Sequence, residues 1–341
     1  DLKSVALMET PWVRQAKSES EARRNVGILF DDNRLNDEER RNFEKLKQMQ
    51  LGDGSWPWFP GGRGNDYITL YITTGFGRLG HLGVDIDPSL AIKSLNRLDN
   101  WINKSYRNVL KHGKKEDNHM SSTIALYLYG RSFFLKQQKI NPNAREAVDY
   151  YLGQAKKYWL ELGNRQSQGH VALALQRFGK DKDTPKAIMR SLKERSVSHE
   201  EMGMFWRDEE LSWWWHRAPI ETQAVMIEAF DEVMNDQKSV EDCKVWLLKQ
   251  KQTQDWKTTK ATADAVYALV LRGSDLLASD ELVKVSLAGM APIKPEKVEA
   301  GTGFYEKRFV GPEIKPDFGK VTVTKVDEGV AWGSVHWQYM E

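Results

Sequence analysis

Cysteine is nearly absent from this 341-residue chain, which has only Cys243 and therefore no internal disulfide. Long hydrophobic runs are absent too, since no apolar stretch approaches the ~20 residues that a membrane-spanning helix needs. There is no excess of one charge either, because 50 Lys and Arg stand against 48 Asp and Glu. That balance gives no support to a nucleic-acid or anionic-membrane partner.

The first residues carry neither an initiator methionine nor a signal peptide. We therefore expect Asp1 to be a cut inside a longer protein. The seven histidines show no metal-binding pattern, since His112 and His119 are too far apart in sequence to share one helix face. We expect no metal and no cofactor. Cys243 falls on the apolar stripe of a helix and should be an inert core residue.

Tryptophan, by contrast, is abundant: 13 residues favour a wide, heavily packed interior. Two loops place glutamine ahead of tryptophan in a similar order, at 47–56 and 246–256. We interpret them structurally: glutamine caps chain ends, glycine makes the turn and tryptophan forms a wedge between hairpins. The alternative is a terpenoid cyclase, whose repeats look similar. Its acid motif is incomplete here, because Asp85-Ile86-Asp87-Pro88 lacks a third acid and is typical of a helix cap.

Helix starts are frequent, and each precedes a single apolar stripe, as in surface helices. The start signals are Asn36 with Glu39, Asp87-Pro88, Asn141-Pro142, Thr184-Pro185 and Ser239. The segments between them differ, because apolar residues surround the helix almost completely. These segments are 119–130, 170–178, 220–233 and 261–272.

One-sided helices alternating with helices buried on both sides predict an outer ring around an inner ring, the α/α toroid. We count roughly five helical hairpins, whereas a closed ring of this kind needs about six. Part of the ring is therefore expected upstream of Asp1. The predicted class is mainly α, with a toroid over 1–275.

The pattern becomes strand-like after 275. Val283 to Leu287 alternates strictly, and 304–310, 321–324 and 330–339 follow, with a turn at 327–329. We expect 276–341 to be a small antiparallel β region, a partial sandwich with open edges through which copies can self-associate.

Aromatic residues lie beside acids in the segment 205–216. They could form a sugar platform with catalytic carboxylates, as in polysaccharide-cleaving enzymes. We favour a connection whose tryptophans plug the ring, because consecutive acids set no catalytic spacing.

Parallel inner helices would gather the segments before them at one mouth of the ring. We expect the main concave surface there, lined by aromatics and a few polar groups. The candidate residues are Trp58, Phe59, Asp66, Tyr67, His119, Trp215, Glu221, Thr262 and Asp264.

Several blocks resemble the bacterial α2-macroglobulin family, its Bacteroidetes-like branch most. They lie in the expected order along nearly the whole chain. They are Met8 to Val13, Gln48 to Arg63, Trp213 to Ala224, Lys257 to Ala265, Gly329 to Gly333 and Trp337 to Tyr339.

The resemblance implies a thioester-domain toroid followed by one half of the β-sandwich (CUB-like) into which the toroid is inserted. Members trap proteases, and in thioester-bearing members a Cys-x-Glu-Gln motif bonds covalently to the protease. That motif is lacking here, because Lys244-Val245-Trp246 follow Cys243. No residue of this chain can therefore be assigned the covalent chemistry.

The sequence thus predicts a non-enzymatic fragment of a protease-trapping inhibitor, whose partners are target proteases met through the full-length parent. The resemblance implies a periplasmic or cell-surface location. The alternative is a toroid enzyme acting on terpenoids or polysaccharides.

Overall fold

The computed structural model describes residues 32–179, 181–207, 219–253, 256, 258–271, 282–288, 291–294, 307–326 and 335. The chain divides into two compact units. One is Lys47–Leu271, and the other combines Asp1–Leu46 with Arg272–Glu341. The last residues of helix α3 (Asp32–Met49) are the first residues of the unit Lys47–Leu271.

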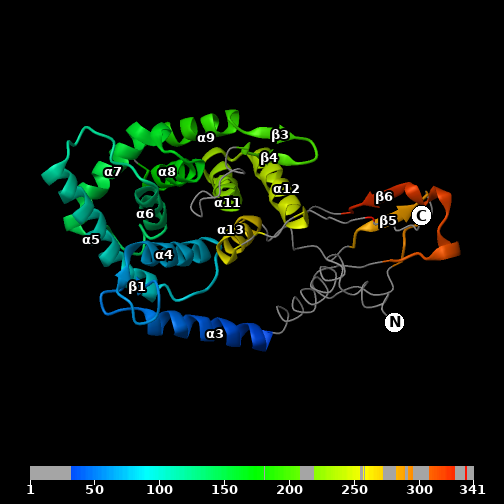
Figure 1. The fold of residues 1–341 in the computed structure, drawn as a ribbon, viewed down its shortest axis with the longest axis horizontal. Coiled ribbons are helices and arrows are strands. Elements are labelled where there is room, and N and C mark those ends of the chain that lie inside the picture. The colour runs from blue at the N-terminus through cyan, green and yellow to red at the C-terminus, as the bar shows by residue number, and fades with distance from the viewer. Residues whose placement is uncertain are drawn as a thin grey trace, which may run out of the picture. The chain divides into compact units, whose positions relative to one another are not determined.

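The unit Lys47–Leu271 has two layers of helices (Figure 1). The inner layer is a row in which each helix packs on the next: α4 (Asp66–His81), α6 (Ser122–Ser132), α8 (Arg165–Phe178), α11 (Pro219–Ala229) and α13 (Thr259–Val270). The outer helices are α5 (Ser89–His112), α7 (Arg145–Tyr158), α9 (Thr184–Glu194) and α12 (Gln237–Thr253). Short pieces connect them: β1 (Trp56–Pro57), β2 (Gly64–Asn65), η2 (Pro142–Ala144), η3 (Trp159–Glu161), β3 (Val197–His199), β4 (Gly203–Phe205) and the π-helical turn η5 (Phe230–Met234).

The predicted class, mainly α with small antiparallel strand pairs, is confirmed. The outer helices are one-sided as expected: α5 buries Leu95, Leu98 and Ile102 along a single stripe. The inner helices are buried on more than one side, and α11 buries every residue from Glu221 to Ala229.

Two predicted helix starts are wrong. Helix α12 begins at Gln237, where the Asp236 carboxylate accepts hydrogen bonds from the backbone N–H and hydroxyl of Ser239. Ser239 is therefore the residue that is capped, and not the cap. Asn36 lies inside α3, which starts at Asp32. In both cases the residue with capping character lies inside the helix and not at its start.

The first Gln–Trp loop is structural. The Gln50 amide donates to the carbonyl oxygens of Gly54, 3.0 Å away, and of Leu90 in α5, 2.8 Å away. Gly54 has φ +85°, and a Cβ there would lie 2.5 Å from the Lys93 carbonyl oxygen. Trp56 is fully buried, and its backbone N–H donates to the Thr69 hydroxyl. Glutamine, glycine and tryptophan thus act as a cap, a turn and a wedge.

The second loop also buries its tryptophan. Trp256 is buried, and its indole N–H donates to the carbonyl oxygen of Leu247 at 3.3 Å. Trp246 of α12 is also buried and stacks on Phe205. Both indoles therefore belong to the core of the unit.

The inner helices are mostly but not completely apolar. Each carries buried polar or charged side chains among its apolar ones, such as Arg131 in α6, His170 in α8 and Glu228 in α11. A buried helix can hold such groups when neighbouring helices supply their partners.

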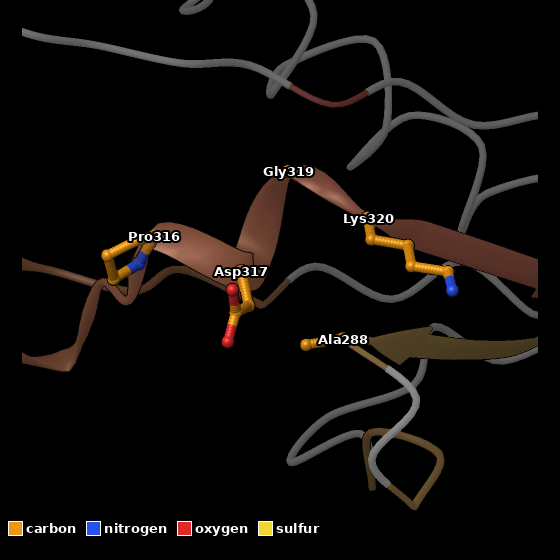
Figure 2. A pocket seen from close by; sticks show the side chains of 5 residues that line it. All are labelled: Ala288, Pro316, Asp317, Gly319 and Lys320. Carbon is orange, nitrogen blue, oxygen red and sulfur yellow. The ribbon is translucent and has the colours of Figure 1, made fainter.

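The described part of the second unit holds one strand pair. Strand β5 (Lys284–Leu287) pairs antiparallel with β6 (Val321–Thr324), in the register Lys284–Thr324 to Leu287–Val321. Two short helices, η6 (Gly311–Glu313) and η7 (Pro316–Gly319), precede β6. Ala288, Pro316, Asp317, Gly319 and Lys320 line a small hollow beside the pair (Figure 2).

Two of the predicted strands, at 283–287 and 321–324, match this pair. Residues 307–310 are described and are not a strand, whereas 304–306, the turn at 327–329 and most of 330–339 lie outside the described residues. Self-association through this region stays a prediction. Among the described helices, none combines the length and apolar character needed to cross a membrane.

Candidate functional site

A connected set of polar side chains lies among the inner helices. We call it the ring-interior network: Arg78 of α4, Tyr129 of α6, His170 and Arg177 of α8, Glu228 of α11, and Asp264 and Tyr267 of α13. It draws on all five inner helices that the structure describes. Two of its directly bonded members, Arg78 and Asp264, are 186 residues apart in sequence.

Arg78 connects the first and last helices of the inner row. Its guanidinium forms an ion pair with Asp264 and donates from Nε to the Tyr129 hydroxyl at 3.1 Å. It also lies 4.8 Å from the centre of the Tyr267 ring. Burial opposes the charged form, but Asp264, Tyr129, Glu228 and Tyr267 together outweigh it and raise the pKa of Arg78. The side chain is therefore a fixed, permanently charged bridge.

Arg177 connects α8 with α11 and the turn that follows it. Its Nε lies 2.8 Å from Glu232 Oε1, and its Nη2 lies 2.6 Å from Glu228 Oε1. The Tyr129 hydroxyl donates to the other oxygen of Glu228. Burial opposes ionisation of Glu228, yet the charges of Arg177 and Arg78 hold its pKa below the usual value. Glu228 is thus a buried carboxylate with both oxygens bonded.

Tyr129 is the centre of this arrangement. The guanidinium carbons of Arg78 and Arg177 lie 5.5 Å and 5.3 Å from the centre of its ring, within cation–π range. The His170 ring stacks on it at 4.6 Å. Burial, followed by the charges of Arg78, Lys260 and Arg177, lowers the pKa of His170 well below its ordinary value. The imidazole is therefore neutral at physiological pH.

Three atoms of this region have no hydrogen-bond partner among the described residues. They are Nε2 of His170, Oε2 of Glu221 and the hydroxyl of Tyr267, and all three side chains are buried. An unmet buried donor or acceptor costs roughly 1–3 kcal/mol. Such groups call for a water molecule, a ligand or a further protein group.

One set of described side chains has ligand atoms close enough for a metal ion. Atoms of His81, Glu228 and Glu232 lie within 4.8 Å of one another. Both carboxylates, however, already bind Arg177. A metal ion would have to displace this guanidinium, so the arrangement favours an ion pair over a metal centre.

Some of the residues predicted to line the mouth lie near one another. Lys260 at the start of α13 lies 3.0 Å from Glu221 Oε1 and 3.6 Å from Asp264 Oδ2. Tyr67 is close to the same acids: burial, then the charges of Asp264 and Glu221, raise its pKa to about 12. Trp58 stacks on Tyr67, with ring centres 6.4 Å apart.

Trp58 and Phe59 form the aromatic edge of this group. Their ring centres are 6.4 Å apart, and their exposed fractions are 51% and 68%. Thr262 is exposed on α13, with its hydroxyl donating to the Thr258 carbonyl oxygen. The structure therefore brings Trp58, Phe59, Tyr67, Glu221 and Asp264 into one neighbourhood.

Two predicted residues have other partners. Asp66 binds Arg97 of α5. His119 contacts α7, since its backbone N–H donates to Gln154 and its ring lies against Tyr150. Trp215 lies outside the described residues. A concave surface at the mouth stays a prediction.

Sequence reasoning missed most of the ring-interior network. Arg177 and Glu228 are charged residues inside segments predicted to be buried on both sides, 170–178 and 220–233. That conflict was a usable signal, because a charge on a buried helix requires a partner of opposite sign. Which residue that partner is can be seen only in the three-dimensional structure.

By sequence, the chain matches no protein-family model and no curated protein. By structure, Escherichia coli α2-macroglobulin activated by porcine elastase aligns with 74% of this chain at 18% identity and a TM-score of 0.45. Salmonella α2-macroglobulin reacted with methylamine aligns with 73% at 18% identity and a TM-score of 0.43.

Native Escherichia coli α2-macroglobulin, from domain MG7 to the C-terminus, aligns with 72% of this chain at 16% identity and a TM-score of 0.43. The aligned parts cover 21%, 15% and 35% of these three chains, respectively, so this chain spans a minor part of each. These bacterial proteins carry the family name to which the sequence blocks point, whereas the Bacteroidetes-like branch stays a prediction.

Proposed function

We propose that this chain is a toroid region, 1–275, followed by part of a β-sandwich, 276–341, from an α2-macroglobulin-like protease-trapping protein. Within the parent, the toroid carries a docking or reactive surface and moves as a rigid body. Its partners are proteases that the parent captures. Because of the same resemblance, we propose that the parent lies in the periplasm or at the cell surface.

The ring-interior network is the observation that carries this proposal. Its ion pairs and ring contacts join every described inner helix, through Arg78 to Asp264 and through Arg177 to Glu228. A buried network of matched charges resists distortion, because separating any pair leaves a charge without a partner. That property suits an element that transmits movement as a single body.

The same network disfavours the enzyme alternative. A glycosidase needs one carboxylic acid that is protonated before it acts and a second one as base or nucleophile. Glu221 and Asp264 instead share Lys260, and Asp264 also binds Arg78, so both carboxylates are already engaged in ion pairs. Asp87, the cyclase-like candidate, accepts hydrogen bonds from the backbone and hydroxyl of Ser89 at the start of α5.

Cys243 cannot supply the covalent step. It is fully buried on α12, and burial raises the pKa of its thiol. A thioester, if the parent has one, uses a cysteine elsewhere. The toroid region of this chain would then position other groups and would not itself react.

The test is protease trapping by the complete parent protein. An enclosed protease keeps its activity on small peptide substrates and loses access to large protein substrates. We expect this selective loss after the parent is mixed with trypsin-like or elastase-like proteases, and no loss with residues 1–341 alone. Unchanged activity on both substrate sizes across a panel of proteases would overturn the proposal. Turnover of a terpenoid or polysaccharide by the chain would favour the alternative.

A further inference from the structure

Helix α5 carries positive charge on its exposed side and no negative charge. Its only acid is Asp99, which is fully buried and pairs with Arg131 of α6. Its lysines and arginines are Lys93, Arg97, Lys104, Arg107 and Lys111. The near balance of charge over the whole chain therefore conceals a local excess of positive charge on this helix.

The five cations lie along one line of the helix, and we call them the basic stripe. At about 100° per residue, their positions fall within an arc of about 80°. The line from Lys93 to Lys111 is about 27 Å long, since each residue adds about 1.5 Å. Four of the cations are exposed, and Arg97 is half-buried. The exposed residues beside the line include Asn96, Asn100 and Asn108, which carry no charge.

Most of the stripe has no partner among the described residues. Arg97 alone forms ion pairs, with Asp53 and Asp66. On the adjacent outer helix α7, the Glu146 carboxylate accepts a hydrogen bond from the Tyr106 hydroxyl at 2.6 Å. The other four cations of the stripe are thus available to a partner outside the unit.

The stripe also opposes the stability of its own helix. Like charges three or four residues apart on a helix repel each other, and Arg107 has two such neighbours in the stripe. Other surface helices place opposite charges at this spacing, as Arg40–Asp37 does in α3 and Lys238–Asp242 in α12. A helix that faces only solvent gains from mixed charges, so a row of one sign favours an anionic partner.

The shape of the stripe favours a flat partner. Helix α5 lies in the outer layer of the unit (Figure 1), with its buried side packed on α4 and α7. A plane touches a cylinder along a single line, so cations confined to one line can all reach it together. A rod-like polyanion that crosses the helix would meet only one or two of them. The anionic headgroups of a phospholipid layer form such a plane.

We propose that the basic stripe docks the unit Lys47–Leu271 on the surface of an anionic phospholipid membrane. The lysine and arginine side chains bind headgroup phosphates, while the apolar side of α5 stays in the core of the unit. Docking of this kind needs neither a protease nor a thioester. It therefore goes beyond the proposed function and is tested separately from it.

The experiment is sedimentation of residues 1–341 with lipid vesicles. The vesicles contain phosphatidylcholine alone or with about one third phosphatidylglycerol. We expect binding to the anionic vesicles only, with weaker binding as salt screens the charges. The variant Lys104→Gln/Arg107→Gln/Lys111→Gln should bind about a hundredfold more weakly, because each cation near an anionic surface contributes about a factor of five.

A matched control removes the same charge elsewhere. Lys182→Gln/Lys186→Gln/Arg190→Gln changes three exposed cations in and just before the outer helix α9, and it should bind much as the wild type does. Arg107→Glu separates binding from folding. It replaces two repulsive pairs with attractive ones, so its melting temperature should rise by about 2 °C while vesicle binding falls.

Failure of the wild type to bind anionic vesicles would overturn the proposal, as would equal losses in the stripe variant and the α9 control. A lower melting temperature for Arg107→Glu would contradict the repulsion on which the argument depends. Tighter binding to a DNA duplex than to the vesicles, at the same salt concentration, would assign the stripe to a nucleic acid instead. No protease takes part in these measurements, so their failure leaves the trapping test unaffected.

Discussion

Arg78 of α4 and Asp264 of α13 form an ion pair, although 186 residues separate them in sequence. Their side chains are 11% and 4% exposed, so water screens the pair poorly. The pair joins the first and last helices of the inner row. Its strength therefore determines whether the two ends of that row stay together.

We expect Arg78→Ala to lower the free energy of unfolding by about 3–5 kcal/mol, because it leaves the Asp264 carboxylate buried without its main partner. Chemical denaturation measures the change. The matched control is Arg97→Ala, whose partners Asp53 and Asp66 are more exposed, and which should cost about 1 kcal/mol or less. Equal losses for the two variants would show that the buried pair has no special role.

The tryptophans of the two Gln–Trp loops should be stabilising. Trp56→Ala and Trp256→Ala each remove a buried indole and should cost about 3–5 kcal/mol in a thermal or chemical melt. A ligand-stacking role predicts the reverse pattern, with stability retained and binding lost. Trp58→Ala is the internal comparison, since this indole is half exposed and its loss should change stability little.

Gly54 tests the geometry of the first loop. Gly54→Ala forces a side chain into a left-handed conformation and against the Lys93 carbonyl oxygen, so it should destabilise the unit by more than about 1 kcal/mol. Gly52→Ala, two residues earlier, adds a methyl group that meets nothing within 4 Å and should be near neutral. If both variants unfold at the same temperature, the turn does not require glycine at position 54.

His170 should make stability depend on pH. Burial and the charges of Arg78, Lys260 and Arg177 lower its folded-state pKa, so below the unfolded value of about 6.5 the unfolded chain binds the extra proton. Stability is then fully present above pH ~6.5 and falls by up to about 1.4 kcal/mol per pH unit as the pH decreases. The difference between wild type and His170→Gln, measured by denaturation from pH 8 to about pH 5, isolates this contribution. A difference that does not change with pH would contradict the neutral, buried imidazole.

Cys243 should be chemically silent. It is buried and its thiol pKa is raised, so thiol reagents should label it only after unfolding. Methylamine should add no mass to residues 1–341, since no thioester can form within them. Rapid labelling of native Cys243, or a methylamine adduct, would show that this chain carries reactive chemistry of its own.

The helical layers could be predicted from the sequence because they follow from local periodicity. The single stripe of α5 and the many apolar residues of α11 identified an outer and an inner helix. The burial of Cys243 and Trp56 followed from the same reasoning. Helix starts were less predictable, since Asp236 and Ser239 have similar capping character and only geometry distinguishes them.

The polar interior could not be predicted in this way. Tyr129 and Glu228 are 99 residues apart, and neither position shows in its local pattern that the other is near. Asp66 shows that residues close in sequence can also have unexpected partners. It lies next to Tyr67 in sequence and at the expected end of α4, yet its partner is Arg97 of the adjacent outer helix.

The Gln50 side chain has a consequence for how this unit folds. By bonding the carbonyl oxygen of Leu90 as well as that of Gly54, it fastens one hairpin to the hairpin that follows it in the chain. Gln223 does the same further along, joining the carbonyl oxygens of Met204 and Cys243. Links of this kind have short sequence separation, so each hairpin can form on the one before it, as in a linear repeat array. Among the described inner helices, α4 and α13 each pack directly on one inner helix, whereas α6, α8 and α11 each pack on two. Hydrogen exchange should therefore be faster in α4 and α13 than in the helices between them.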